Sequence, residues 1–186
     1  MVCMGSTDRT NLPSETRAAR RRARVVDPLS PAQRRTNMQR VRTRNTKPEL
    51  LLRRALHAVG LRFRLNKPGL PCRPDLVLPR WKVVMFVHGC FWHGHKCSRG
   101  VQPRTNVAFW DAKIAGNQQR DVAQVAALHA LGWRVGIVWE CALVGRYRLD
   151  VAHMVDDFEL WLRSDGPIIE ITESGNPDKA QQVDKT

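Results

Sequence analysis

Two near-continuous apolar runs constrain the fold of this chain more than any other feature. They span residues 82–88 (KVVMFVH) and 133–139 (WRVGIVW). A run of this kind is typical of a strand that lies inside a sheet and is covered on both faces. The two runs therefore predict an α/β protein in which helices cover a central sheet.

Hydrophobic spacing and turn residues predict the remaining elements. Helices are expected over residues 34–44, 46–60, 106–116, 119–131 and 149–162. Short strands are expected over residues 61–65 and 75–78. The order α-β-β-β-α-β-α predicts one domain, in which helices flank a mixed β-sheet.

The same patterns divide the chain into three parts. A basic arm covers residues 1–30, a folded domain covers residues 31–163, and a polar tail that we expect to fray covers residues 164–186. The arm contains a basic cluster at 17–24 (RAARRRAR), followed by proline breakers. It either contacts phosphates loosely or is a solvated extension, and the sequence favours neither interpretation.

Positive charge is concentrated in the middle of the chain, whose formal net charge is +14. Residues 31–105 contain 17 basic residues and only two acidic ones, Glu49 and Asp75. Lys and Arg release condensed counterions when they meet phosphates, so this block indicates a nucleic-acid partner. The alternatives are a basic protein without such a partner and a protein that binds anionic membranes.

The sequence argues against membrane and secreted classes. It has no apolar run near the roughly 20 residues that a membrane span requires, and its first residues resemble no secretory signal. Five cysteines, an odd number, argue against a disulfide scaffold. We therefore expect a cytoplasmic protein that does not bind membranes. Cys3 and Cys72 have no role that the sequence assigns.

Metal-binding residue types gather in residues 88–97 (HGCFWHGHKC). Cys90, His95 and Cys97 are spaced C-x4-H-x-C, and Cys141 follows the second apolar run. Thiolates and an imidazole suit a tetrahedral Zn²⁺ site that would pin this irregular segment to the end of a strand. The alternative is that these cysteines are small buried apolar residues.

The two acidic residues of the basic block indicate a second site. Asp75 begins one predicted strand and His88 ends the next, so a hairpin would place them side by side. Glu49, on the preceding helix, reaches the same end of the sheet. Carboxylates that hold Mg²⁺ beside an imidazole suit phosphodiester hydrolysis. Alternatively, Asp75 is a turn residue after Pro74, and Glu49 belongs to a capping box.

Three aromatic residues lie in or beside the irregular basic segment: Phe91, Trp92 and Trp110. Rings near a phosphate-binding surface stack on bases or wedge between them. Core packing is the alternative for any tryptophan, and we expect it for the tryptophans of the second apolar run and of the last helix.

Five segments stand in an order that identifies a family. They are LPCRPDLVL (70–78), FVHGCFWH (86–93), FWDAKIAGN (109–117), Arg120-Asp121 and GWRVGIVWECAL (132–143). Together they resemble the very-short-patch repair (Vsr) DNA mismatch endonucleases. The resemblance covers residues from about 35 to 162, which leaves the arm and the tail outside it.

The resemblance implies a restriction-endonuclease-like core and a defined reaction. The family nicks one DNA strand on the 5′ side of the thymine in a T·G mismatch, using Mg²⁺. Such mismatches arise when 5-methylcytosine deaminates. The implied partners are double-stranded DNA with a T·G mismatch, mismatch-repair proteins and, through function, a DNA cytosine-5 methyltransferase. A monomer in the bacterial cytoplasm is the implied state.

The resemblance also implies the roles of individual residues. Asp75 resembles the aspartate that binds the metal, together with the carbonyl of Val87. His88 and His93 resemble two active-site histidines, and we expect His93 to activate the water. Glu49 resembles a helix glutamate near the waters on the metal.

Further roles follow from the same resemblance. The structural zinc ligands would be Cys90, His95, Cys97 and Cys141. The aromatics wedged beside the mismatch would be Phe91, Trp92 and Trp110. Met38 and Val41 resemble apolar residues of an N-terminal helix that approaches from the other groove.

The chain departs from the family pattern at three positions. Some members have threonine in place of Val87, and valine preserves a carbonyl contact but not a hydroxyl role. Gly94 and Lys96 replace histidines of other members, which leaves His95 as the zinc ligand there. Two other functions stay open: a zinc-stabilised DNA-binding protein without catalysis, and a nicking or restriction endonuclease for intact duplex.

Overall fold

The computed structural model describes residues 29–173. Almost all of the basic arm and the end of the polar tail therefore lie outside the described residues. The helices are α2 (Pro31–Gln39), α3 (Lys47–Ala58), α4 (Val107–Ala130), α5 (Glu140–Leu143) and α6 (Val151–Arg163). The strands are β1 (Leu76–Leu78), β2 (Val83–His88), β3 (Arg134–Trp139) and β4 (Ile168–Ile171), and two short 3-10 helices are Pro79–Trp81 and Ser98–Gly100.

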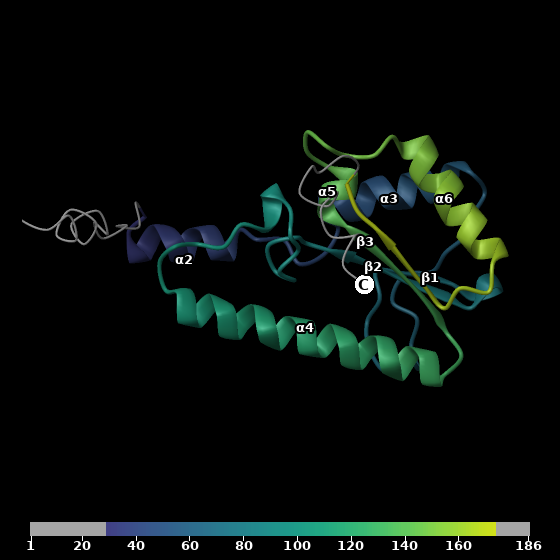
Figure 1. Ribbon diagram of the computed structural model, residues 1–186, viewed down its shortest axis with the longest axis horizontal. Coiled ribbons are helices and arrows are strands. Elements are labelled where there is room, and N and C mark those ends of the chain that lie inside the picture. Colours follow the sequence, from purple (N-terminus) through teal and green to yellow (C-terminus); the bar gives the residue numbers. More distant parts are fainter. Residues whose placement is uncertain (1–28, 174–186) are drawn as a thin grey trace, which may run out of the picture.

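The strands form one mixed sheet in the order β1-β2-β3-β4. β1 is antiparallel to β2, whereas β2, β3 and β4 are parallel neighbours. Figure 1 shows α4 on one side of this sheet and α3, α5 and α6 on the other. The mixed sheet flanked by helices confirms the predicted α/β class. Because His88 pairs with Trp139 in register, β2 and β3 end at the same edge.

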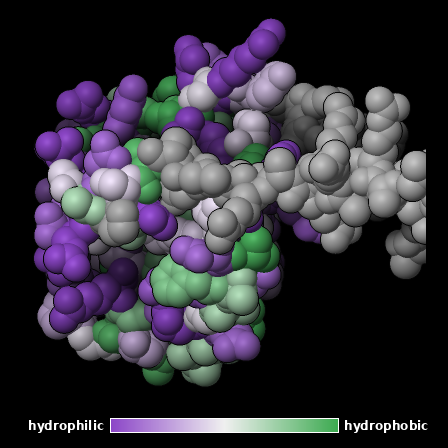
Figure 2. All heavy atoms as spheres, turned by 90° about the vertical axis from the view of Figure 1, so that its left-hand side faces the viewer, coloured by the Kyte–Doolittle hydropathy of each residue, from purple (hydrophilic) through white to green (hydrophobic). Residues whose placement is uncertain are grey.

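The surface at the α2 end of the molecule is mostly polar. Figure 2 looks at this side and shows hydrophilic residues with smaller apolar patches between them. Arg35, Arg40, Arg42 and Arg44 are exposed here, in and just after α2. No helix among residues 29–173 is long and apolar enough to cross a membrane.

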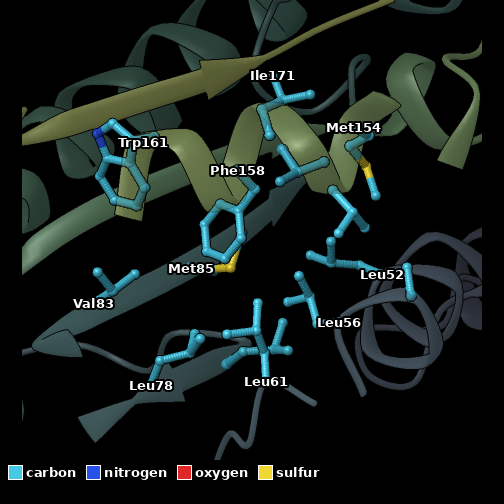
Figure 3. Close-up of a cluster of buried hydrophobic side chains, with 14 of the residues drawn as sticks. Leu52, Leu56, Leu61, Leu78, Val83, Met85, Met154, Phe158, Trp161 and Ile171 are labelled. Carbon is cyan, nitrogen blue, oxygen red and sulfur yellow. The ribbon is translucent and has the colours of Figure 1, made fainter. Parts of the chain in front are cut away.

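The larger core lies between the sheet and the α3/α6 layer (Figure 3). Leu52 and Leu56 of α3 and Phe158 of α6 are almost fully buried against Met85 of β2. A smaller core on the opposite face includes Leu128 of α4. Because both faces of the sheet are covered, β2 is apolar along its length. The predicted site residues begin at its end, with His88.

Several predicted boundaries are wrong. Residues 168–171 were expected in the polar tail, but they form β4 beside β3, and Ile171 is buried. The expected strand over 61–65 reduces to one bridge between Arg64 and Val77. The two helices expected over 106–131 are one helix, α4, because an isolated Gly116 costs only about 1 kcal/mol and does not stop a helix.

The helix starts show why α2 and α3 begin where they do. Ser30 and Thr46 each cap a helix with their side chains, and each forms a capping box with the residue three positions later. α2 consequently starts at Pro31. It ends at Gln39, so both of its ends come earlier than those of the expected helix over 34–44.

Candidate active site and metal centre

The shared edge of β2 and β3 brings distant segments of the sequence together. His88 is the last residue of β2, and the loop that follows carries Cys90 to Cys97. Cys141 lies in the short helix α5, directly after β3. The parallel register therefore places the metal-binding segment beside Cys141, although Cys141 lies 44 positions after Cys97.

The structure brings the four predicted zinc ligands into one cluster. One potential ligand atom from each of Cys90, His95, Cys97 and Cys141 lies within 4.8 Å of all the others. The Cys141 backbone N–H donates to Cys90 Sγ at 3.3 Å, and His95 Nδ1 lies 3.5 Å from Cys141 Sγ. Three sulfurs and one imidazole at this spacing fit a tetrahedral ion that prefers soft ligands.

Two features of this cluster favour a bound cation. The hydrogen bond with the Cys90 thiol lowers the pKa of Cys141 to about 6, despite the opposing effect of burial. The loop is also closely packed, since a Cβ atom at Gly100 would overlap the carbonyl oxygen of His95. Cys141 is thus inclined toward the thiolate, which is the protonation state that binds metals, whereas the hydrogen bond with Cys141 and burial raise the pKa of Cys90, and burial raises the pKa of Cys97.

A cleft of about 970 Å³ lies beside this cluster. Its walls come from the α2–α3 region, the β1–β2 hairpin, the loop after β2 and α4. Eight of the predicted site residues line it: Met38, Val41, Glu49, Asp75, Val87, His88, Trp92 and His93. The structure thus joins, in one cavity, residues that the sequence assigned to catalysis and to DNA contact.

Asp75 is positioned by the strand that follows it. The Val87 backbone N–H donates to Asp75 Oδ2 at 2.7 Å. Burial raises the pKa of Asp75 to about 6; the Val87 hydrogen bond opposes this shift, and the charge of Glu49 adds to it. A desolvated carboxylate of this kind is stabilised by a cation, so Asp75 and the neighbouring Val87 carbonyl fit a hard divalent ion.

Two stacked imidazoles line the same cleft as Asp75. The rings of His88 and His93 are parallel to within 6°, with centroids 4.0 Å apart. Burial, reinforced by the proximity of His93, lowers the pKa of His88 to about 4, so His88 is neutral at pH 7. His93 Nδ1 lies 2.5 Å from Asp121 Oδ2, and His88, His93 and Asp121 form a second cluster able to hold a metal.

The sequence interpretation gave no role to Asp121 or to its neighbours on α4. Asn117 Nδ2 donates to the carbonyl of Trp92 at 2.6 Å, and Gln118 Nε2 donates to that of His93 at 3.1 Å. Together with the Asp121–His93 contact, these hydrogen bonds hold the loop against α4. The four-residue spacing of Asn117 and Asp121, which places them on one helix face, is the signal that could have revealed them.

Glu49 lies in the cleft wall and also completes the capping box of α3. It is 5% exposed and forms an ion pair with Arg53, whose Nη2 lies 2.8 Å from Glu49 Oε2. The capping role, left open as an alternative, is therefore present in the structure.

The aromatic rings of the three predicted wedge residues pack together at the N-terminus of α4. The centroid of Phe91 lies 5.0 Å from Trp92 and 5.1 Å from Trp110, and the two tryptophans are 6.1 Å apart. All three side chains are half-buried. The neighbouring Phe109 is 61% exposed and contacts Trp110. The three rings are therefore partly exposed to solvent and belong to none of the buried core clusters among residues 29–173.

Trp139 lies between the two groups of histidines. Its ring stacks on His95 at 4.3 Å and meets His88 edge-on at 5.4 Å. It is 8% exposed and packs with Cys90, Cys97 and Cys141. The expected core role of this tryptophan is confirmed.

Comparison with known proteins matches residues 26–99 to the family model described as DNA mismatch endonuclease Vsr. The chain is 40% identical over 151 residues to the DNA mismatch endonuclease Vsr of Escherichia coli, which spans 81% of this chain and 97% of the relative. It is 50% identical over 119 residues to the type II nicking enzyme V.XorIIP of Xanthomonas oryzae, spanning 64% of this chain and 88% of the relative. A Neisseria meningitidis nicking enzyme, V.NmeAIP, is 40% identical over 119 residues, spanning 64% of this chain and 85% of the relative.

Proposed function

The chain belongs to the family of Vsr DNA mismatch endonucleases, and from this premise we propose that it nicks one strand of duplex DNA. The proposed cut lies on the 5′ side of the thymine in a T·G mismatch. The observation that carries the proposal is the single cleft in which Asp75, His88, His93 and Trp92 meet. A protein that only binds DNA has no need of a half-buried carboxylate that shares a cleft with two imidazoles.

Mg²⁺ is the proposed ion at Asp75 and the Val87 carbonyl oxygen, where it would neutralise charge that develops on the scissile phosphate. His93 is the proposed base. Its Nδ1 is engaged by Asp121, so Nε2 is the nitrogen that accepts the proton of the attacking water. His88, kept neutral by burial, packs against the His93 ring and holds its plane.

Selection of the mismatch is proposed to come from the aromatic cluster. Phe91, Trp92 and Trp110 enter the stack beside the T·G pair, and a mismatched step costs less to unstack than a Watson–Crick step. Met38 and Val41, which are 49% and 42% exposed, contact the other groove. Because Trp92 immediately precedes His93, insertion of the ring and placement of the base are coupled by one peptide bond.

Zn²⁺ is the proposed ion of the Cys90, His95, Cys97 and Cys141 cluster, in a structural role. The folded domain is proposed to extend from residue 31 beyond the expected limit of 163, since it includes β4. The proposed biological substrate is the product of 5-methylcytosine deamination. A DNA cytosine-5 methyltransferase would create its precursor, and mismatch-repair proteins would act on the nick made by a monomeric enzyme.

A nicking assay tests the proposal directly. Three duplexes carry T·G, T·A or C·G at one position, each labelled on one strand and incubated with and without Mg²⁺. The expected result is Mg²⁺-dependent cleavage of the T strand in the T·G duplex alone. Equal cleavage of T·A or C·G would support an endonuclease for intact duplex. Binding without cleavage would support the zinc-stabilised DNA-binding protein.

A further inference from the structure

Arg53 links two segments that border the cleft. Its Nη1 donates to Asn45 Oδ1 at 2.6 Å, and its Nη2 donates to Glu49 Oε2 at 2.8 Å. The Arg53 side chain is only 15% exposed. Asn45 has a positive φ of 52°, at the point where the chain turns into α3. The guanidinium therefore holds both the turn and the acidic residue in the first turn of the helix.

The Glu49 carboxylate has its acceptor positions filled. Oε2 accepts from the backbone N–H of Asn45 at 3.0 Å and from Arg53. Oε1 accepts from the Thr46 hydroxyl at 2.8 Å and from the Thr46 backbone N–H at 3.4 Å. A carboxylate offers about four lone-pair positions, and four donors occupy them here. A cation would bind Glu49 directly only by displacing one of these donors.

Arg53 is the charged donor among these four. The other three are two backbone amides and a hydroxyl, which compete weakly with a divalent cation for a carboxylate. Glu49 and Asp75 line the same cleft, and their charges interact. Without the guanidinium, a dication at Asp75 would attract the Glu49 carboxylate out of the helix cap.

We propose that Arg53 is a positioning residue that keeps Glu49 in the cap, so that Asp75 is the one carboxylate that a divalent cation meets directly. This inference rests on the proposed metal-dependent function and assigns a task to a residue outside the predicted site. It implies that Arg53 weakens the binding of the cation at Asp75. It also implies that positions around this cation stay open to substrate and water.

The test measures Mn²⁺ binding to the full-length protein without DNA, by the loss of the sharp signal of free Mn²⁺ in electron paramagnetic resonance. Mn²⁺ prefers the same oxygen ligands as Mg²⁺. Arg53→Gln should bind Mn²⁺ about fivefold or more tightly than the matched control Arg54→Gln, because a nearby positive charge is lost and Glu49 is released. Arg54 is exposed on the same helix and carries the same charge, whereas the charge of Arg53 also acts on Asp75. Equal affinity of the two variants would overturn the proposal.

A second variant removes the ion pair as a whole. Glu49→Gln/Arg53→Gln replaces a charged pair with a neutral one, so Mn²⁺ affinity should stay within about twofold of wild type. A loss of about tenfold or more would show that Glu49 binds the ion directly, which overturns the proposal. This test stands even if Arg53→Gln alone fails to fold. The double variant leaves the core residues of α3, Leu52 and Leu56, unchanged (Figure 3).

Turnover separates positioning from general damage. At saturating Mg²⁺, Arg53→Gln should nick the T·G duplex at least about fivefold more slowly than Arg54→Gln, and Arg53→Lys should recover most of the rate. Tighter ion binding with slower cleavage is a combination that partial unfolding does not give. If wild type cleaves no T·G duplex, the proposed function fails. If wild type cleaves but the affinities of the two single variants agree, only the role of Arg53 fails.

Discussion

His93 Nδ1 and Asp121 Oδ2 lie 2.5 Å apart, although one residue belongs to the loop after β2 and the other to α4. A carboxylate on Nδ1 fixes the tautomer and the plane of an imidazole, and it stabilises the protonated ring once Nε2 has taken a proton. In this protein the same helix also holds the carbonyls of Trp92 and His93. The orientation of the proposed base is thus a property of α4 as much as of the loop.

Asp121→Asn should slow nicking of the T·G duplex by about tenfold or more, because the amide cannot stabilise the protonated His93 ring. DNA affinity should change by less than about twofold. Single-turnover cleavage and binding by fluorescence anisotropy provide the two measurements. Asp156→Asn, on the exposed face of α6, removes the same charge and should leave both unchanged. Cleavage at the wild-type rate in Asp121→Asn would refute the role of this pair.

Asp75→Asn should reduce nicking by orders of magnitude, because the amide keeps the shape but lacks the charge that anchors Mg²⁺. Affinity for T·G duplex should stay constant or rise, since repulsion between the carboxylate and phosphate is relieved. A gel-shift titration beside the cleavage assay separates the two effects. A variant that still cleaves normally would remove Asp75 from the proposed active site.

The same substitution should stabilise the protein when no divalent cation is added. Burial raises the pKa of Asp75 to about 6 from an ordinary 3.8, so its ionisation in the folded state opposes folding. This destabilisation is absent below about pH 4 and complete above about pH 6, where it amounts to about 1–3 kcal/mol. Thermal melting of Asp75→Asn and wild type should therefore differ more at pH 7.5 than at pH 5. A less stable variant at pH 7.5 would contradict the assignment of burial as the main cause.

Purified protein should contain about one zinc per chain. Cys97→Ala should lose most of this zinc and melt at a lower temperature, because ligand binding contributes to folding of the loop. Cys72→Ala is the matched control, since Cys72 is outside the cluster and should retain the metal. Elemental analysis and differential scanning fluorimetry measure the two quantities. Folded wild-type protein without zinc would end this interpretation.

Trp110→Ala should weaken binding of the T·G duplex by about tenfold or more, because a stacked ring contributes about 1–3 kcal/mol. Its melting temperature should fall much less than that of Trp161→Ala, which removes a buried ring from the main core. Binding curves with T·G and T·A duplexes, compared with melting curves, provide the check. A large loss of stability with unchanged discrimination would return Trp110 to a packing role.

Local sequence patterns predicted much of the candidate site. The four cysteine and histidine ligands form one cluster because three of them lie in one short loop and the fourth follows a strand in register with β2. Asp75 and His88 line the same cleft because a hairpin joins their strands. Features that depend on packing between distant segments were not predicted. Asp121 reaches His93 across 28 residues, and β4 is four residues long in a polar setting. Glu49 combines a cap with a cleft wall, which no single pattern indicates.

The indole of Trp139 divides the sheet edge into two compartments. The ring stacks on the imidazole of His95 beside the thiols, and it meets His88 and His93 in edge contacts. Its only polar group, the ring N–H, donates to Glu170. The indole therefore offers no atom that could serve as a metal ligand. Without Trp139 between them, one metal ion could bind ligands from both the cysteine-containing cluster and the His88–His93–Asp121 cluster. An apolar partition between them would keep the ligands of the two proposed metal sites apart.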